Sequence, residues 1–450
     1  LFVVFFVSNY SKGSIVFLNS PFLKNDSTKI NKLTFHNYRT NFRENVKFYG
    51  NIRNDLFYDS RFNASARENL IDLFPLPKNI INGTDAYEKA TFNFLAVTTR
   101  FGWLIDSLFL YKTKISGRIE ADFLGSLDIT YGTLRLRHAY IELRWKKFNL
   151  FLGQSYLPMN QNTDLIAENI NFTSGSPFSP LGYGEQLRLT YKPVKNFYTT
   201  LSFFIPRNFA GFATSFVSTF QNTNINNTIG TPQYSIPDNQ PSFNSILPSI
   251  NLNLYFKNDK VLAGIMADFT RISPYNSYFD SSIKALNINH NNVESFSFFS
   301  YFMYKSRNLT FKLQTIKSQN LTTGSMIGGY VGIIDKNGLE SFKPINVFST
   351  WSEFYINFNE WQPGIFIGYS AVESIPKQAK NVYAIGINVT PGMPTINYLW
   401  RIAPRIAYLY NKFYVGLELE YTSVNYQESK TPISYNVANF RSQLITIFYF

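Results

Sequence analysis

Residues 412–424 read KFYVGLELEYTSV, and this stretch decides the fold. Leu417 and Leu419 fall on one face of an extended chain, and Glu418 and Glu420 fall on the other. Successive side chains of a β-strand point to opposite faces, so this period of two predicts a strand with one apolar and one polar face. No comparable stretch of the chain has the spacing of a helix.

The same alternation recurs from Val46 to Phe450, for example in residues 114–127 and 248–257. Short and long connectors alternate strictly between the expected strands. The seven short or moderate connectors are expected at residues 105–113, 146–147, 193–196, 257–260, 305–308, 357–360 and 411–412. The eight mostly longer connectors are expected at residues 59–89, 128–131, 157–183, 207–247, 272–291, 318–346, 371–396 and 425–435.

This arrangement of connectors is typical of a transmembrane β-barrel. Such barrels have an even number of antiparallel strands, short periplasmic turns and longer external loops. Eight loops and seven turns predict about 16 strands, and a barrel of that size leaves a water-filled lumen. Residues 381–389 also look extended, but an even strand number assigns them to the seventh long loop. The predicted fold class is therefore an all-β, antiparallel transmembrane barrel.

Composition excludes several other classes. Aromatic residues make up 18% of the 450 residues and charged residues only 16%, whereas a soluble domain has about 25% charged residues. Such an apolar composition does not fit a disordered chain. The longest apolar run, residues 1–7, is too short for a membrane-spanning helix, which needs about 20 residues.

Charge and the rarest residues narrow the choice further. The 42 Lys and Arg residues exceed the 29 Asp and Glu residues, which gives a net charge of +13, but no Lys/Arg block suggests nucleic acid as a partner. The absence of cysteine excludes disulfides and Cys-ligated zinc. His36, His138 and His290 have no metal-binding spacing. We expect no cofactor and no metal.

The N-terminal residues are expected to lie outside the barrel. The apolar residues 1–7 resemble the core of a signal peptide without its basic leader, although a first strand is the alternative. The expected organisation is a signal-peptide remnant at residues 1–20, a lead-in at residues 21–44 and the barrel at residues 45–450.

A resemblance to a known family rests on residues 134–154, which read LRLRHAYIELRWKKFNLFLGQ. They resemble outer-membrane porins of the Bacteroidetes type, and more loosely a group of trimeric porins with an R-x-R-H-A-Y-x-E-L strand followed by a G-Q strand. Shorter similar pieces lie at residues 48–61, 93–102 and 398–413. The resemblance implies a 16-stranded, trimeric diffusion channel in the outer membrane of a Gram-negative cell, with one loop folded inward.

The C-terminus supports the same interpretation. Apolar residues alternate at Phe440, Leu444, Phe448 and Phe450. A terminal aromatic residue on such a strand is the signal that the outer-membrane barrel-assembly machinery reads, so this machinery and membrane lipid are expected partners. The alternative is an edge strand of a soluble sheet, which would be an aggregation hazard in water.

Charged residues on the strands are the candidate functional residues. In contact with lipid, an Arg or Lys would cost about 2–4 kcal/mol near the membrane midplane, so we expect these side chains to face the lumen. There they would set ion selectivity, or alternatively only pair with one another within the wall. The predicted pore-lining charges are Arg118, Glu120, Asp122, Arg135, Arg137, Arg188, Lys192, Arg401, Arg405, Glu418 and Glu420.

Arg135 and Arg137 break the simple alternation, because they share parity with the apolar Ala139 and Ile141. A β-bulge near His138 would re-aim the strand and turn both arginines inward. A subunit interface that buries one end of the strand is the alternative.

Two further sets of residues are candidates for the pore loop and for the membrane interfaces. The nearly uncharged residues 207–247 are the first candidate for a loop that narrows the pore, and residues 157–183 are the second. Aromatic residues near strand ends suit the girdles at the membrane interfaces. These are Tyr49, Trp103, Trp145, Trp351, Trp361, Trp400, Tyr408 and Tyr410.

The sequence thus predicts a passive porin for small hydrophilic solutes and ions. One alternative is a substrate-specific channel for sugars or oligosaccharides, which a ladder of lumen aromatics would favour. A barrel enzyme would need His138 within hydrogen-bond reach of a hydroxyl group, and no G-x-S-x-G motif is present. A soluble β-rich binding or adhesion protein is the last alternative. The chain lacks room for the plug and 22 strands of an energy-coupled receptor.

Overall fold

The computed structural model describes residues 45–450 apart from 126–129, 174, 207–241, 243–244, 275–276, 281–284, 337–338 and 430. The expected signal-peptide remnant at residues 1–20 and lead-in at residues 21–44 lie outside these described residues. No helix within the described part is both long and apolar enough to cross a membrane.

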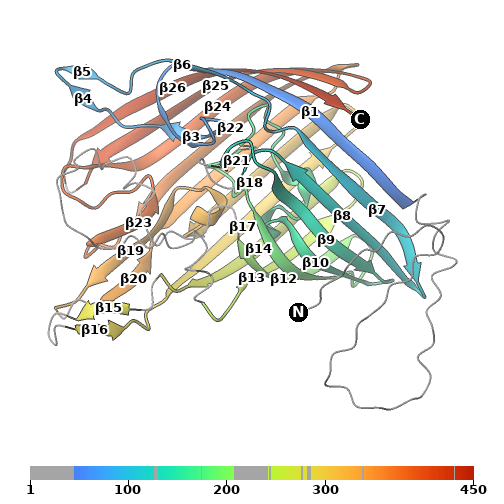
Figure 1. The fold of residues 1–450 in the computed structure, drawn as a ribbon, viewed down its shortest axis with the longest axis horizontal. Coiled ribbons are helices and arrows are strands. Elements are labelled where there is room, and N and C mark those ends of the chain that lie inside the picture. The colour runs from blue at the N-terminus through green and yellow to red at the C-terminus, as the bar shows by residue number, and fades with distance from the viewer. Residues whose placement is uncertain are drawn as a thin grey trace, which may run out of the picture. The chain divides into compact units, whose positions relative to one another are not determined.

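One large antiparallel sheet closes on itself, because the last strand pairs with the first, with Leu56 opposite Leu444. The strands run diagonally across the view in Figure 1. Its segments are β1 (Val46–Asp59), β6 (Thr91–Leu95), β7 (Arg100–Leu110), β8 (Thr113–Asp122), β9 (Arg135–Arg144), β10 (Phe148–Tyr156), β11 (Tyr183–Tyr191), β12 (Phe197–Pro206), β13 (Ser249–Lys257), β14 (Val261–Ile272), β17 (Val293–Lys305), β18 (Leu309–Gln319), β21 (Asn346–Ile356), β22 (Trp361–Ser374), β24 (Pro394–Tyr410), β25 (Phe413–Glu428) and β26 (Ser434–Tyr449).

The seventeen segments form sixteen barrel strands, because β6 and β7 are two parts of one strand. Both pair with β1: β6 pairs with Asp55–Asp59 and β7 with Val46–Asn51. Residues 96–99 interrupt the strand between them, and there the Thr98 hydroxyl donates a hydrogen bond of 2.6 Å to Asp55 Oδ2. The structure therefore confirms the predicted closed 16-stranded antiparallel barrel.

The predicted alternation of short turns and long loops is also confirmed, with one correction. Residues 105–113 are not a connector: β7 continues to Leu110, and only Tyr111 and Lys112 form the turn. A β-bulge between Ile105 and Leu108 breaks the alternation there, which makes the strand look like a turn in the sequence. The ends of the barrel are called the short-turn end and the long-loop end below.

Several long loops carry small sheets of their own. Residues 381–389, expected in the seventh long loop, contain β23 (Asn381–Ile385), which pairs with β19 outside the barrel sheet. The hairpins β4–β5 and β15–β16 lie at the left of Figure 1. These segments are β2 (Asn63–Ala66), β3 (Ile71–Pro75), β4 (Ile80–Ile81), β5 (Thr84–Asp85), β15 (Ser277–Asp280), β16 (Ala285–Ile288), β19 (Gly328–Ile334) and β20 (Glu340–Pro344), with 3-10 turns at η3 (Pro158–Asn160), η4 (Thr163–Leu165) and η5 (Thr322–Gly324).

The two faces of the strands differ as the alternation predicts. On β25, Leu417 and Leu419 are exposed on the outer face, while Glu418 and Glu420 are buried on the inner face. The outer face of the barrel is thus apolar and suits contact with lipid. Trp351 and Tyr49 correct the predicted girdle. Trp351 is buried inside the barrel, where its Nε1 donates a hydrogen bond of 2.8 Å to Gln314. Tyr49 faces the same side, because its hydroxyl donates a hydrogen bond of 2.8 Å to the buried Glu120.

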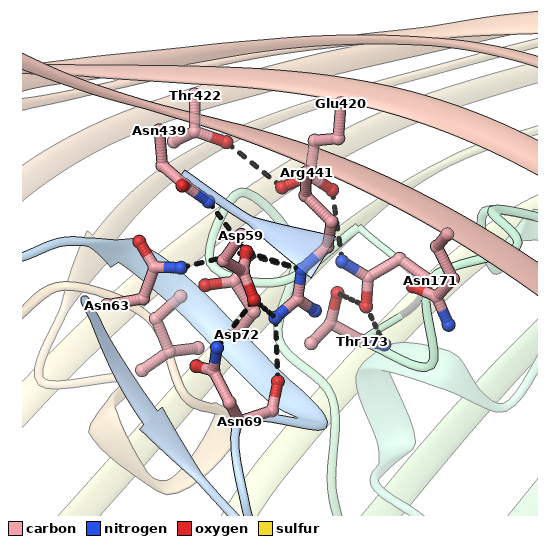
Figure 2. A network of polar contacts seen from close by, with 12 residues as sticks. Asp59, Asn63, Asn69, Asp72, Asn171, Thr173, Glu420, Thr422, Asn439 and Arg441 are labelled. Carbon is pink, nitrogen blue, oxygen red and sulfur yellow. Dashed lines mark hydrogen bonds and ion pairs between the residues drawn. The ribbon is translucent and has the colours of Figure 1, made fainter. Parts of the chain in front are cut away.

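A buried ion pair crosses the seam where β26 meets β1. Arg441 on β26 donates two hydrogen bonds, of 2.9 and 2.8 Å, to the carboxylate of Asp59 at the end of β1. The side-chain amides of Asn439, Asn63 and Asn69 also donate to this carboxylate (Figure 2). Neither member of the ion pair is exposed.

We predict that Arg441→Met lowers the free energy of unfolding by about 3–5 kcal/mol, because it leaves the Asp59 carboxylate buried without its cation. Urea unfolding in lipid vesicles, followed by tryptophan fluorescence, measures this loss.

The matched control is Arg271→Met, since Arg271 belongs to a partly exposed pair with Glu294 at 3.9 Å. We expect a loss of less than about 1 kcal/mol there. An equal loss in the two variants would contradict the role assigned to the seam.

Candidate functional site

The predicted pore-lining charges lie on the inner face of the wall, opposite the exposed apolar side chains. Eight of them are buried, while Arg118, Arg188 and Lys192 are half-buried. Arg118 has about a third of its side chain accessible. Contact between these side chains and permeating ions stays a prediction.

The predicted bulge near His138 is present. His138 lies opposite Glu120, and Leu136 lies opposite the next residue, Ala121, so Arg137 is the extra residue on β9. Arg137 and His138 are both buried although they are neighbours in the chain. The bulge therefore places Arg135 and Arg137 on the same side of the wall as Glu120.

The two arginines pair with carboxylates of β8. Arg135 binds both oxygens of Asp122, at 3.0 and 2.6 Å. Arg137 binds Glu120 at 2.8 Å and Asp122 at 3.0 Å. Arg118 contacts Glu120 as well. These buried, charge-assisted bonds hold the guanidinium groups in fixed positions along one side of the lumen.

Residues 157–182, which connect β10 and β11, cross the lumen to the opposite wall. The carboxylate of Glu353 on β21 accepts hydrogen bonds from the backbone N–H of Glu168, at 3.0 and 3.1 Å. The carboxylate of Glu418 accepts the N–H groups of Ile170, at 2.9 Å, and Asn171, at 3.1 Å. Because β21 and β25 lie several strands from β10 around the barrel, these contacts place residues 157–182 inside it.

Wall cations bind the carbonyl groups of the same loop. Lys312 on β18 donates to the carbonyl of Ile166 at 2.7 Å and lies 3.0 Å from Glu168 Oε1. Arg401 donates to the carbonyl of Ser176 at 3.0 Å. Residues 157–183, the second candidate for the narrowing loop, therefore occupy the lumen, whereas nearly all of the first candidate, residues 207–247, lies outside the described part.

The first long loop joins this network, and Figure 2 shows its residues Asn69 and Asp72 beside Arg441. Asp72 on β3 lies 3.4 Å from Arg401 and 3.9 Å from Arg441. Arg401 also pairs with Glu420 at 3.0 Å, and Glu420 accepts a hydrogen bond from Asn171 of the lumen loop. Arg401 and Glu420 thus fasten two loops to the wall, which is the wall-pairing alternative considered above.

Several residues of this network were missed in the sequence. Lys312, Glu353 and Arg441 follow the same inward parity within their strands, so the alternation rule finds them when it is applied to β18, β21 and β26. Arg405 pairs with Glu353 at 3.1 Å. Asp72 has no such signal, because it lies in a loop whose path depends on the finished barrel.

A cavity of about 140 Å³ lies between the β7–β9 wall and the lumen loop. Arginine is the only charged residue type among the described residues that line it. Arg100 makes no ion pair with any described residue, and its Nε has no hydrogen-bond partner. The charged lining consists of Arg53, Arg67, Arg100, Arg135 and Arg137.

A second cavity, of about 280 Å³, lies toward the short-turn end. Arg188 has no ion pair among the described residues; its guanidinium lies 4.2 Å from the centre of the Phe151 ring. Among the described residues, Arg188 Nε, Gln161 Nε2 and Asn162 Nδ2 have no hydrogen-bond partner, whereas Arg188 Nη1 donates to Gln161 Oε1 at 3.4 Å. Glu142 is the one acidic residue in this lining, and the basic residues are Arg144, Lys146, Lys147, Arg188 and Lys192.

His138 lies within reach of a hydroxyl group, as the enzyme alternative requires: its Nδ1 is 3.1 Å from Ser155 Oγ. Its Nε2, however, is 3.9 Å from Glu120, whose carboxylate already binds Tyr49 and Arg137. Both His138 and Ser155 are buried, and neither lines the two cavities. A nucleophile needs a base held by a third group and access to substrate, so this pair is part of the wall.

The described residues offer no site for a metal ion, because no group of three or more His, Cys, Asp or Glu side chains converges among them. The two cavities are lined by guanidinium, ammonium, amide and aromatic groups, together with the Glu142 carboxylate in the second.

Comparison with known proteins agrees with this architecture. A family model described as DcaP outer membrane protein matches residues 8–191. The crystal structure of the outer membrane channel DcaP of Acinetobacter baumannii is similar with a TM-score of 0.60 and 15% sequence identity, over 90% of this chain and 97% of that chain. OmpT of Vibrio cholerae, an outer membrane protein, is similar with a TM-score of 0.50 and 9% identity, over 90% of this chain and 97% of that one. No curated protein sequence matches the chain.

These structural likenesses establish the fold: the chain forms a β-barrel with the architecture of outer-membrane, porin-like channels.

We predict that Lys312→Met loosens the lumen loop, because the loop loses the cation that binds Ile166 and Glu168. Single-channel recordings in planar bilayers should show at least about a twofold increase in current noise in the open state, since a loop that opens locally fluctuates on the timescale of such recordings.

Lys317→Met is the control, because Lys317 lies on the same strand but is exposed and pairs with Glu373. Noise that increases equally in both variants, or in neither, would argue against this anchoring role.

Proposed function

We propose that this outer-membrane barrel is a passive porin that lets small hydrophilic solutes diffuse and prefers anions. The observation that carries the proposal is the pair of basic cavities on one side of the lumen loop. Among the described residues, each lining contains five Lys and Arg side chains. The two linings together contain one acidic side chain, Glu142. No cofactor and no energy coupling are required.

The sign of the preference follows from how the charges are paired. Arg401, Arg405, Glu418 and Glu420 neutralise one another or bind the lumen loop, so they contribute little net field. Arg100 and Arg188, which make no ion pair with a described residue, keep a positive charge next to a cavity. Inside a low-dielectric wall, such a charge attracts anions and repels cations more strongly than it would in bulk water.

The two cavities suggest a route for the anion. The first lies beside Arg100, Arg135 and Arg137, and the second lies beside Arg188 and Lys192 toward the short-turn end. An oxyanion that leaves the first cavity would find free nitrogen donors of Arg188, Gln161 and Asn162 in the second. Passage between weak sites of the same sign gives selectivity without trapping the ion.

Assembly and origin belong to the same proposal. The barrel would be inserted by the barrel-assembly machinery through β26 and Phe450, and three copies would form a homotrimer with the short turns in the periplasm. Phe450 packs against Phe48 of the first strand, with ring centres 5.7 Å apart, so the terminal aromatic residue lies at the closing seam. The motif in residues 134–154 supports a Bacteroidetes-type porin.

A sugar-specific channel is the second candidate, because one observation favours it. Tyr198 and Tyr255 stack at 5.0 Å with an angle of 10° between their rings, and both line the second cavity. A flat aromatic surface binds sugar rings well. If oligosaccharides block the current at micromolar concentration, and if Tyr198→Ala abolishes the block, this candidate replaces the anion channel.

We predict that the refolded protein conducts in planar bilayers and that its reversal potential in a KCl gradient reports a preference for chloride. Arg100→Gln combined with Arg188→Gln should shift the potential toward the value for cations. Each lost charge is worth about 1 kcal/mol at 4 Å in water, or about fivefold in the permeability ratio.

Arg271→Gln serves as the control, because Arg271 lies on the outer face near the long-loop end and lines neither cavity. Its reversal potential should equal that of the native protein. A folded barrel that does not conduct removes the porin proposal, and unchanged selectivity in the double variant removes the anion route.

A further inference from the structure

Positive charge concentrates at the short-turn end of the barrel. Six of the seven short turns carry an exposed Lys or Arg, and together the seven turns contain only two acidic residues, Asp259 and Glu360. The basic residues in the turns are Lys112, Lys146, Lys147, Lys192, Lys195, Lys260, Arg307 and Lys412. These turns, although they are short, thus supply much of the net charge of +13.

The long-loop end does not share this excess. The first long loop contains four basic residues, Arg61, Arg67, Lys78 and Lys89, and four acidic ones, Glu68, Asp72, Asp85 and Glu88. The described part of residues 320–345 likewise contains two residues of each sign. The asymmetry between the two ends is therefore a property of this chain and does not reflect its Lys-rich composition alone.

Exposed aromatic side chains accompany the basic turns. Trp145 and Phe148 flank Lys146 and Lys147, and Phe197 follows Lys195 closely in the chain. Others near the turns are Phe109, Tyr111, Tyr304, Phe358, Trp361, Tyr410 and Phe413. Aromatic rings concentrate at the level of the lipid headgroups, and long basic side chains beside them extend toward the headgroup phosphates.

We infer that the short-turn end binds the anionic phospholipid headgroups of the leaflet that it faces. The distribution of the cations favours lipid over an acidic protein. Basic residues occur in turns all around the barrel, as an annulus of lipid requires, whereas a docked protein would meet one sector. Cationic side chains close to a membrane surface attract anionic lipid within about a Debye length.

The inference rests on the proposed function in one respect only. That function places the short turns in the periplasm, so the leaflet that they face is the periplasmic one. The lipid preference itself can be measured on any folded barrel, whether or not it conducts. Failure of the channel proposal and failure of this one are therefore distinguishable.

The experiment uses the full chain in phosphatidylcholine vesicles with spin-labelled phosphatidylglycerol or phosphatidylcholine as probe. Electron paramagnetic resonance gives the association of each probe with the protein relative to the host lipid. We expect phosphatidylglycerol to be preferred by about twofold or more at low salt and the preference to fall in 1 M salt, where screening is strong.

The test variant changes one basic residue in each of six turns to Gln: Lys112, Lys146, Lys195, Lys260, Arg307 and Lys412. The matched control changes six exposed lysines of the long-loop end to Gln: Lys78, Lys89, Lys336, Lys343, Lys377 and Lys380. The preference for phosphatidylglycerol should disappear in the test variant and persist in the control.

A smaller variant, with Lys146, Lys195 and Lys260 changed to Gln, keeps the inference testable if the sixfold variant does not fold, and it should lose about half of the preference. The absence of any preference in the native protein, or an equal loss in the control, would overturn the inference. So would binding to an acidic periplasmic protein or to isolated cell wall that the test variant loses while its lipid preference stays intact.

Discussion

The structure depends on one constraint: within hydrocarbon, each backbone N–H and C=O group of the sheet needs a partner in the protein. A sheet meets this constraint only if it has no free edge, so the pairing of β26 with β1 decides the rest. Once the sheet is closed, each strand has an inside and an outside, and the alternation of side chains becomes a division between lipid and lumen. The ion pair of Asp59 and Arg441 lies at this seam, where the first and last strands of the barrel meet.

Closure also explains why so many charged residues can be buried in a protein with few charges. The wall carries carboxylates and guanidinium groups on its inner face, and many of these groups bind the loops inside the barrel. Glu353 and Glu418 bind backbone N–H groups of residues 157–182, while Lys312 and Arg401 bind carbonyl groups of the same segment. Among the described residues, Arg100 and Arg188 make no ion pair, and in the proposed channel they would be the main charges that act on the solute. In the proposed channel, ion selectivity would therefore depend on the few charges that no partner neutralises.

The sequence predicts the parts of this architecture that repeat. Strand positions, the order of short and long connectors, and the bulge at Arg137 all follow from the period of two and its one interruption on β9. Residues 105–110 are strand and not the predicted connector, because a β-bulge interrupts the alternation of side chains in the same way as a turn does. Trp351 and Tyr49 lie inside the barrel and not in the predicted girdle, because the inward parity of their positions decides where an aromatic side chain goes. The path of residues 157–182 and the burial of Asp72 depend on contacts with strands far away in the sequence, and no local pattern encodes such contacts.

The lumen loop has a mechanical consequence. It leaves the wall at β10, reaches β18, β21 and β25 on the other side, and is bonded there by side chains that are themselves part of the sheet. A span fixed at both walls of a tube acts as a strut. Squeezing the barrel into an oval would have to compress or stretch this span and distort its ionic contacts. The cross-section should therefore stay nearly constant when the lateral pressure of the bilayer changes, and the aperture should be set by side chains rather than by the state of the membrane.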